Sequence, residues 1–140
     1  MTTAIDTNII VSLWDKDAKL SSLAKTALDS ALQRGGLIIS APVFAELIAC
    51  PGRNEIFVDS FLRDTGIAVD WELGESVWRE AGRAFRAYAS RRRKHGQTGP
   101  RRILADFLIG AHAFGHDCEL LTLDGSLYGA AFPQLKILRV

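Results

Sequence analysis

Five short apolar runs, separated by segments with helical periodicity, are the feature that most constrains the fold of this chain. Each run is too short for a typical helix, and several are rich in β-branched residues, as strands are. The runs occupy residues 2–5, 37–40, 67–70, 120–123 and 136–140. Because helical patterns fill the intervals between the first four runs, the sequence predicts an α/β fold with a mostly parallel five-stranded sheet and helices on both of its faces.

The helical segments show apolar residues that recur every three or four positions, together with signals for where each helix ends. Two adjacent glycines follow the first segment, and Asn54 can cap the third. The expected helices cover residues 20–32, 41–50, 54–66, 73–88 and 102–115. The last of these is almost entirely apolar, yet it carries one aspartate, Asp106, which needs a cation or several hydrogen-bond donors if it is buried.

The length of 140 residues fits a single domain, residues 1–140, with one hydrophobic core. No apolar run approaches the length needed to cross a bilayer, and the first ten residues lack the basic start of a secretory signal. The two cysteines, Cys50 and Cys118, are too few for a disulfide scaffold. These features predict a protein of a reducing compartment, the cytoplasm.

The small net charge of +1 hides a basic segment. Nine of the 17 Lys and Arg residues lie between Arg79 and Arg102, where Glu80 is the only acid. Such a segment suits a polyanion such as RNA, although a solvated helix surface also collects arginine. The candidate RNA-binding residues are Arg91, Arg92, Arg93, Lys94, Arg101 and Arg102.

Four acidic residues each stand alone in a stretch of at least 14 residues that has no other formal charge. They are Asp6, Glu46, Asp106 and Asp124. Three of them follow predicted strands or sit one turn into the helix after a strand. Since ligand sites in parallel sheets form at the carboxyl ends of the strands, we expect these acids and the start of the helix that carries Asp106 to meet there.

Four converging carboxylates cannot all stay ionised without a cation. Ligation by oxygen alone favours a hard divalent ion, Mg²⁺ or Mn²⁺. Such an ion acidifies a bound water and stabilises the charge that develops on phosphate, so the expected reaction is hydrolysis of a phosphodiester. The basic segment would then contact the phosphate backbone.

Each acid also has a simpler role when it is considered alone. Asp6 can cap the next helix, and Glu46 can be an exposed helix residue. Asp106 can pair with Arg102 four residues earlier. Asp124 precedes a glycine, as in many turns. Because all four simple roles would have to coincide at one edge of the sheet, we favour a shared metal site.

Four stretches together resemble the PIN domain: AIDTNII, APVFAELI, RILADFLIGAHA and LLTLDGSLYGAAFPQLKIL. Within that family, the short chain resembles the VapC-type ribonuclease toxins of type II toxin–antitoxin pairs. The resemblance implies a three-layer α/β/α sandwich, Mg²⁺- or Mn²⁺-dependent endoribonuclease activity, a cognate antitoxin and a homodimer. It also implies that the four acids form the catalytic metal site and that Asn8 and Thr122 orient ligands or water.

Two other functions remain open. A phosphatase-like hydrolase could use Asp6 as a nucleophile. Such enzymes need a second aspartate two residues later, and Asn8 occupies that position here. A non-catalytic PIN-fold adaptor could bind RNA or a partner without cutting, although an intact acid set argues against it. The spacing of His112, His116 and Cys118 suggests zinc, but with no fourth ligand nearby in sequence we interpret these histidines as packed residues rather than ligands.

Overall fold

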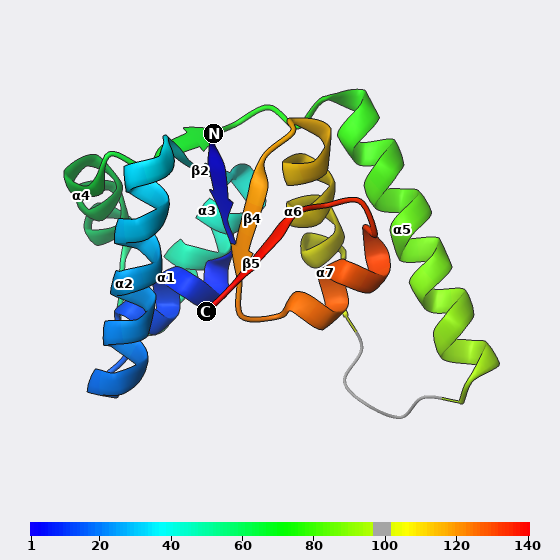
Figure 1. Ribbon diagram of the computed structural model, residues 1–140, viewed down its shortest axis with the longest axis horizontal. Helices are drawn as coiled ribbons and strands as arrows, with labels where there is room; N and C mark the ends of the chain where they lie inside the picture. The colour runs from blue at the N-terminus through cyan, green and yellow to red at the C-terminus, as the bar shows by residue number, and fades with distance from the viewer. Residues whose placement is uncertain (97–101) are drawn as a thin grey trace.

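The computed structural model describes residues 1–96 and 102–140 and contains one five-stranded sheet (Figure 1). All paired strands run parallel, in the order β3-β2-β1-β4-β5. The strands are β1 (Thr3–Ile5), β2 (Leu37–Ser40), β3 (Ala68–Asp70), β4 (Glu119–Thr122) and β5 (Ile137–Arg139). The predicted α/β class and parallel sheet are therefore confirmed.

Seven helices accompany these strands in the part of the chain that the structure describes. They are α1 (Thr7–Leu13), α2 (Ala18–Arg34), α3 (Ala41–Ile48), α4 (Glu55–Thr65), α5 (Gly74–Lys94), α6 (Leu104–Gly115) and α7 (Gly125–Ala131). In the view of Figure 1, α1, α2 and α4 lie to the left of β1 and β4, and α5, α6 and α7 lie to the right. None of the described helices combines the length and apolar character needed to span a bilayer.

The centre of the sheet is the most deeply buried part of the molecule. Strands β1 and β4 are buried along their whole length, whereas the edge strands β3 and β5 are partly exposed. This is the pattern of a parallel sheet that is covered by helices on both faces, and it explains the short, continuous apolar runs in the sequence.

Helix α7 packs directly on α6 because Gly110 has no side chain. A Cβ atom at Gly110 would lie 2.3 Å from the ring of Phe132 and 3.0 Å from the ring of Tyr128. Both aromatic residues are almost fully buried in the core. The absence of a side chain on α6 therefore fixes where α7 places Tyr128.

The order of the strands changes direction at β1, because β2 and β3 lie on one side of it and β4 and β5 lie on the other. Strand β1 pairs with β2 on one side and with β4 on the other, and its register sets Ile5 beside Leu121. Asp6, which directly follows β1, and Thr122, the last residue of β4, therefore lie side by side at the carboxyl ends of adjacent strands. This is the topological switch point at which open parallel sheets bind their ligands.

Two helices were not expected from the sequence. Helix α1 consists of seven residues rich in β-branched and polar side chains, and α7 contains Gly125 and Gly129. Neither composition favours a helix, so packing against the sheet and α6 overrides local propensity in both. Helix α5 also continues to Lys94, beyond the apolar stripe that ends at Tyr88.

Candidate active site

Asp6 lies at the end of β1, where its carboxylate is buried. The backbone N–H of Asp6 donates to the Leu121 carbonyl at 3.0 Å, and Oδ2 accepts a 2.7 Å hydrogen bond from the hydroxyl of Thr122. Asp6 occupies the N-cap position of α1, but its side chain makes no capping hydrogen bond. The carboxylate is thus held mainly by β4, through Thr122.

The loops that follow β1 and β4 are joined by a small hydrogen-bond network. The Asp124 N–H donates to the Thr122 hydroxyl at 2.9 Å, and the Leu123 N–H donates to Asn8 Oδ1 at 3.2 Å. Thr122 therefore contacts both Asp6 and the backbone of Asp124. Asn8 fixes the intervening residue, so both side chains hold the loop that presents Asp124.

Glu46 reaches the same region from α3. Its Oε1 atom accepts a 2.5 Å hydrogen bond from the hydroxyl of Thr7, the residue that follows Asp6. Glu46 is half-buried and is not a freely exposed helix residue. The helix that follows β2 therefore brings a third acid to the end of β1.

Asp106 lies in the first turn of α6 and is half-buried. Burial raises its pKa above the ordinary value, and the charge of Asp124 adds to this effect, while the Ile103 N–H and the Arg102 charge oppose it. The guanidinium of Arg102 forms its ion pair with Asp124, at 2.7 Å. Asp106 is therefore affected by the charges of both Arg102 and Asp124, but the ion pair of Arg102 is with Asp124.

Tyr128 of α7 is a residue of this site that the sequence did not reveal. Its side chain is 1% exposed, and its hydroxyl makes no hydrogen bond of ordinary geometry with a described residue, although it faces Asp6. Burial raises the pKa of Tyr128, and three carboxylates contribute further, those of Asp6, Asp106 and Glu46. The hydroxyl thus lies among three of the four acids.

The electrostatics of the site favour a bound cation. Burial, with a smaller contribution from the nearby Asp106, raises the pKa of Asp6 from 3.8 to about 6, despite the hydrogen bond from Thr122. A divalent ion would offset the repulsion between these carboxylates. The donor atoms are oxygens throughout, and a buried hydroxyl without a partner lies among them, so the residues fit a hard ion such as Mg²⁺ or Mn²⁺.

The structure thus places Asp6, Glu46, Asp106 and Asp124 at one end of the sheet, with Asn8 and Thr122 in contact with the loop that carries Asp124. The four carboxylates do not form a tight cluster. Among the described residues, no three of these acids have carboxylate oxygens that all lie within 4.8 Å of one another. Three of them, Asp6, Asp106 and Glu46, lie near the hydroxyl of Tyr128 instead.

The basic segment lies near this site only in part. Residues 91–94 form the last turn of α5, and Figure 1 shows this end of α5 at the same end of the molecule as the start of α6. Arg102 contacts Asp124 directly. Arg101 lies outside the described residues.

Comparison with known proteins gives a family and a set of similar structures. The sequence matches the PIN domain family over residues 3–133. The fold is similar to VapBC2 from Rickettsia felis bound to a DNA fragment from its promoter, with a TM-score of 0.69 and 19% identity over 99% of this chain and 98% of that chain.

Two further structures share the fold. One is VapBC-1 from nontypeable Haemophilus influenzae, with a TM-score of 0.64 and 20% identity over 99% of this chain and 98% of that one. The other is FitAcB from Neisseria gonorrhoeae, with a TM-score of 0.64 and 21% identity over 98% and 96%. A search of curated proteins gives no match. With its family match over nearly the whole length and its parallel sheet, the chain belongs to the PIN domain family.

Proposed function

We propose that this PIN domain is a Mg²⁺- or Mn²⁺-dependent endoribonuclease that acts as the toxin of a toxin–antitoxin pair. One observation carries the proposal: the buried carboxylate of Asp6, with its raised pKa, lies at the topological switch point with Asp106 and Glu46 around the same hydroxyl. PIN domains are generally nucleases, and this arrangement supports the same chemistry here.

The site residues have separate roles in this proposal. A hard divalent ion held by Asp6, Glu46, Asp106 and Asp124 would acidify a water and stabilise negative charge on the scissile phosphate. Thr122 fixes the rotamer of Asp6 through its hydrogen bond and holds the Asp124 backbone. Arg102 is 41% exposed beside Asp124, so its guanidinium can bind a phosphate of the substrate.

RNA cleavage by the purified protein tests the catalytic part of the proposal. We expect wild type to cut RNA with Mg²⁺ present and to stop cutting when EDTA is added. Asp106→Asn keeps the shape of the side chain and removes its charge, so a folded variant should lose cleavage. Asp29→Asn is the matched control, because Asp29 is exposed on α2 and paired with Lys25, and its loss should leave cleavage unchanged.

A folded Asp106→Asn variant that cleaves RNA like wild type would contradict the metal-site assignment. RNA binding without cleavage by wild type would instead indicate the adaptor function.

The toxin role is tested by growth. The similar structures are VapBC and FitAB complexes, among them a toxin–antitoxin complex from Klebsiella pneumoniae, and this supports an antitoxin as the partner. We expect expression of the wild-type chain alone to arrest growth of its host, and Asp6→Asn or co-expression of the antitoxin to restore it. A homodimer is proposed from the resemblance to VapC-type toxins, and its mass in solution can be measured by light scattering. Growth that continues during expression of soluble wild-type protein would contradict the toxin role.

A further inference from the structure

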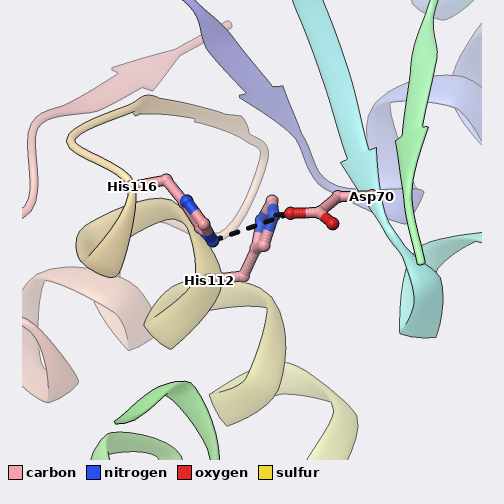
Figure 2. Close-up of side chains that lie close together, drawn as sticks. All are labelled: Asp70, His112 and His116. Atoms are coloured by element: carbon pink, nitrogen blue, oxygen red, sulfur yellow. Dashed lines mark hydrogen bonds and ion pairs between the residues drawn. The ribbon is translucent and has the colours of Figure 1, made fainter. Parts of the chain in front are cut away.

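A second group of metal-ligating side chains lies at the opposite end of α6 from Asp106. Asp70, His112 and His116 point toward one another, as Figure 2 shows. The Nε2 atom of His112 lies 3.0 Å from Asp70 Oδ2, and the Nε2 atom of His116 lies 3.6 Å from the same oxygen. The ligand atoms of the three residues all lie within 4.8 Å of one another.

Two secondary structure elements hold this group. His112 lies on α6, and His116, four residues later, is the C-cap of the same helix; their ring centroids are 4.8 Å apart. Asp70 is the last residue of β3, the edge strand, and is 42 residues from His112 in sequence. The edge of the sheet thus supplies a carboxylate to a pair of imidazoles on a buried helix.

We propose that Asp70, His112 and His116 form a second metal site, which binds a divalent transition ion such as Zn²⁺ and is separate from the acid site. On the sequence, zinc was set aside because His112, His116 and Cys118 have no fourth ligand nearby. The structure brings a different residue, Asp70 from a distant strand, to the two histidines.

The spacing of the ligand atoms suits such an ion. Zn²⁺ lies about 2.0–2.2 Å from imidazole nitrogens and carboxylate oxygens in a tetrahedral site, which places neighbouring ligand atoms about 3.3 Å apart. The two measured nitrogen–oxygen distances, 3.0 and 3.6 Å, bracket this value. These two spacings are therefore compatible with ligation of one ion by Asp70 and both imidazoles.

The exposure of the ligands gives the ion a route to the site. The side chain of His112 is 1% exposed, that of Asp70 is 24% exposed and that of His116 is 48% exposed. His112 anchors the site from inside, while the other two residues face solvent. Water can fill the remaining coordination position on that side.

The ligand types separate this site from the acid site. Imidazole nitrogen suits Zn²⁺, Cu²⁺, Ni²⁺ and Fe²⁺, whereas sites made of oxygen alone suit Mg²⁺ and Mn²⁺. His112 lies six residues after Asp106 on α6, which is about 9 Å along the helix axis. The two sites therefore differ in both ion preference and position.

Ion binding requires a change of tautomer at His112. An Nε2–H group that donates to Asp70 Oδ2 must present a lone pair instead, so the proton moves to Nδ1 and Asp70 Oδ2 turns to the ion. The neutral imidazole is the form that binds metals.

Cys118 is not part of the site. Its thiol donates to the His116 carbonyl with a sulfur–oxygen distance of 3.6 Å and is absent from the group of ligand atoms within 4.8 Å. Burial also raises its pKa, with contributions from Asp117 and Asp70, so the thiolate that would bind an ion is disfavoured.

A simpler role for the cluster is a hydrogen bond that ties β3 to α6. That role uses the hydrogen bond between His112 and Asp70 and, when His116 is protonated, an ion pair between His116 and the same oxygen. The metal site also accounts for both imidazoles, and the two roles predict different responses to Zn²⁺.

NMR of the wild-type protein distinguishes them, because the chain has only three histidines and His95 is exposed at the end of α5. With excess Mg²⁺ present, we expect Zn²⁺ to shift the Nε2 resonances of His112 and His116 with a stoichiometry of one ion per chain. The resonances of His95 should stay unchanged. Equal effects on all three rings, or none at micromolar Zn²⁺, would overturn the proposal.

Variants extend the test without relying on the buried residue. His116→Gln and Asp70→Asn alter exposed ligands, and each should weaken Zn²⁺ binding about tenfold or more and abolish the rise in Tm that the ion gives wild type. His95→Gln is the matched control and should bind Zn²⁺ like wild type. Asp106→Asn should also keep the Zn²⁺ site, so that failure of the nuclease proposal and failure of this one remain distinguishable. Unchanged Zn²⁺ affinity in a folded His116→Gln variant would overturn the assignment.

Discussion

The hydroxyl of Thr122 donates a 2.7 Å hydrogen bond to the carboxylate of Asp6, and the two residues are 116 positions apart in sequence. Both are buried, and they end adjacent parallel strands. A hydrogen bond to a charged, buried group is among the stronger ones in proteins. This contact joins the first strand to the fourth at the point where the proposed catalytic acid lies.

Thr122→Val should therefore impair both stability and the acid site. Valine keeps the shape but removes the hydroxyl, so Asp6 loses a donor and the Asp124 N–H loses an acceptor. We expect a loss of about 2 kcal/mol in the free energy of unfolding, measured with urea. RNA cleavage should also require more Mg²⁺. Thr122→Ser keeps the hydroxyl and should retain the Mg²⁺ requirement of wild type; a valine variant with that same requirement would show that Thr122 does not position Asp6.

Asp6→Asn should change how stability depends on pH in the absence of divalent metal. The folded pKa of Asp6 is about 6, against 3.8 as its ordinary value, so the folded chain keeps a proton that the unfolded chain has released between these pH values. The stability from this group is complete below pH 3.8 and is lost as pH rises through 6. The loss is about 3 kcal/mol, and the asparagine variant should not show it.

Urea unfolding with EDTA at pH 4 and pH 7 measures this difference. Asp29→Asn should follow the pH dependence of wild type, because Asp29 is exposed. Parallel pH profiles for wild type and Asp6→Asn would mean that the Asp6 carboxyl titrates in the ordinary range.

Tyr128→Phe should separate stability from activity. The Tyr128 hydroxyl is buried without a hydrogen-bond partner among the described residues, so its removal should leave the metal-free protein at least as stable as wild type. The same hydroxyl lies among three carboxylates, and its loss should lower the rate of RNA cleavage. Thermal unfolding and a cleavage assay on one preparation measure both effects. A variant destabilised by more than about 1 kcal/mol would imply that the hydroxyl is paired in solution.

The basic end of α5 should contribute to RNA binding. In an Asp106→Asn background, replacing Arg91, Arg92 and Arg93 by alanine should weaken RNA binding and reduce the slope of log K against log salt by about 2, since each contact with a single strand contributes about 0.7. Fluorescence anisotropy at several salt concentrations measures the slope. The matched control replaces three exposed lysines at the start of the chain, Lys16, Lys19 and Lys25. If both triple variants lose affinity equally, RNA binding does not depend on the end of α5.

Much of the fold could be predicted because its signals are local. The run at residues 37–40 is the strand β2, and Asn54 caps α4 through a 2.8 Å hydrogen bond from the Phe57 N–H, as expected. Helices α1 and α7 were missed because a few β-branched residues or glycines give no helical signal by themselves. Their conformation depends on packing that the sequence does not display.

The acids could be found because an isolated charge in an apolar stretch is visible in sequence. Tyr128 could not, because a tyrosine among small and apolar residues looks like an ordinary core residue, and its position depends on the close approach at Gly110. Its one available signal is that it lies a single helical turn after Asp124. Asp70 could not be found in this way, because Glu72 lies two residues after it and Asp70 is therefore not an isolated charge. Its partner His112 is 42 residues away in sequence.

The hydrogen bond between Thr122 and Asp6 also determines when the acid site can form while the chain is being synthesised. Asp6 leaves the ribosome 116 residues before Thr122 does. A nascent chain that stops before Thr122 can pair β1 with β2 but has no β4 to complete the other side of β1. The proposed acid site therefore cannot assemble until β4 and the residues that follow it have left the ribosome, so a nascent toxin that stops before Thr122 cannot attack RNA beside the ribosome that is making it.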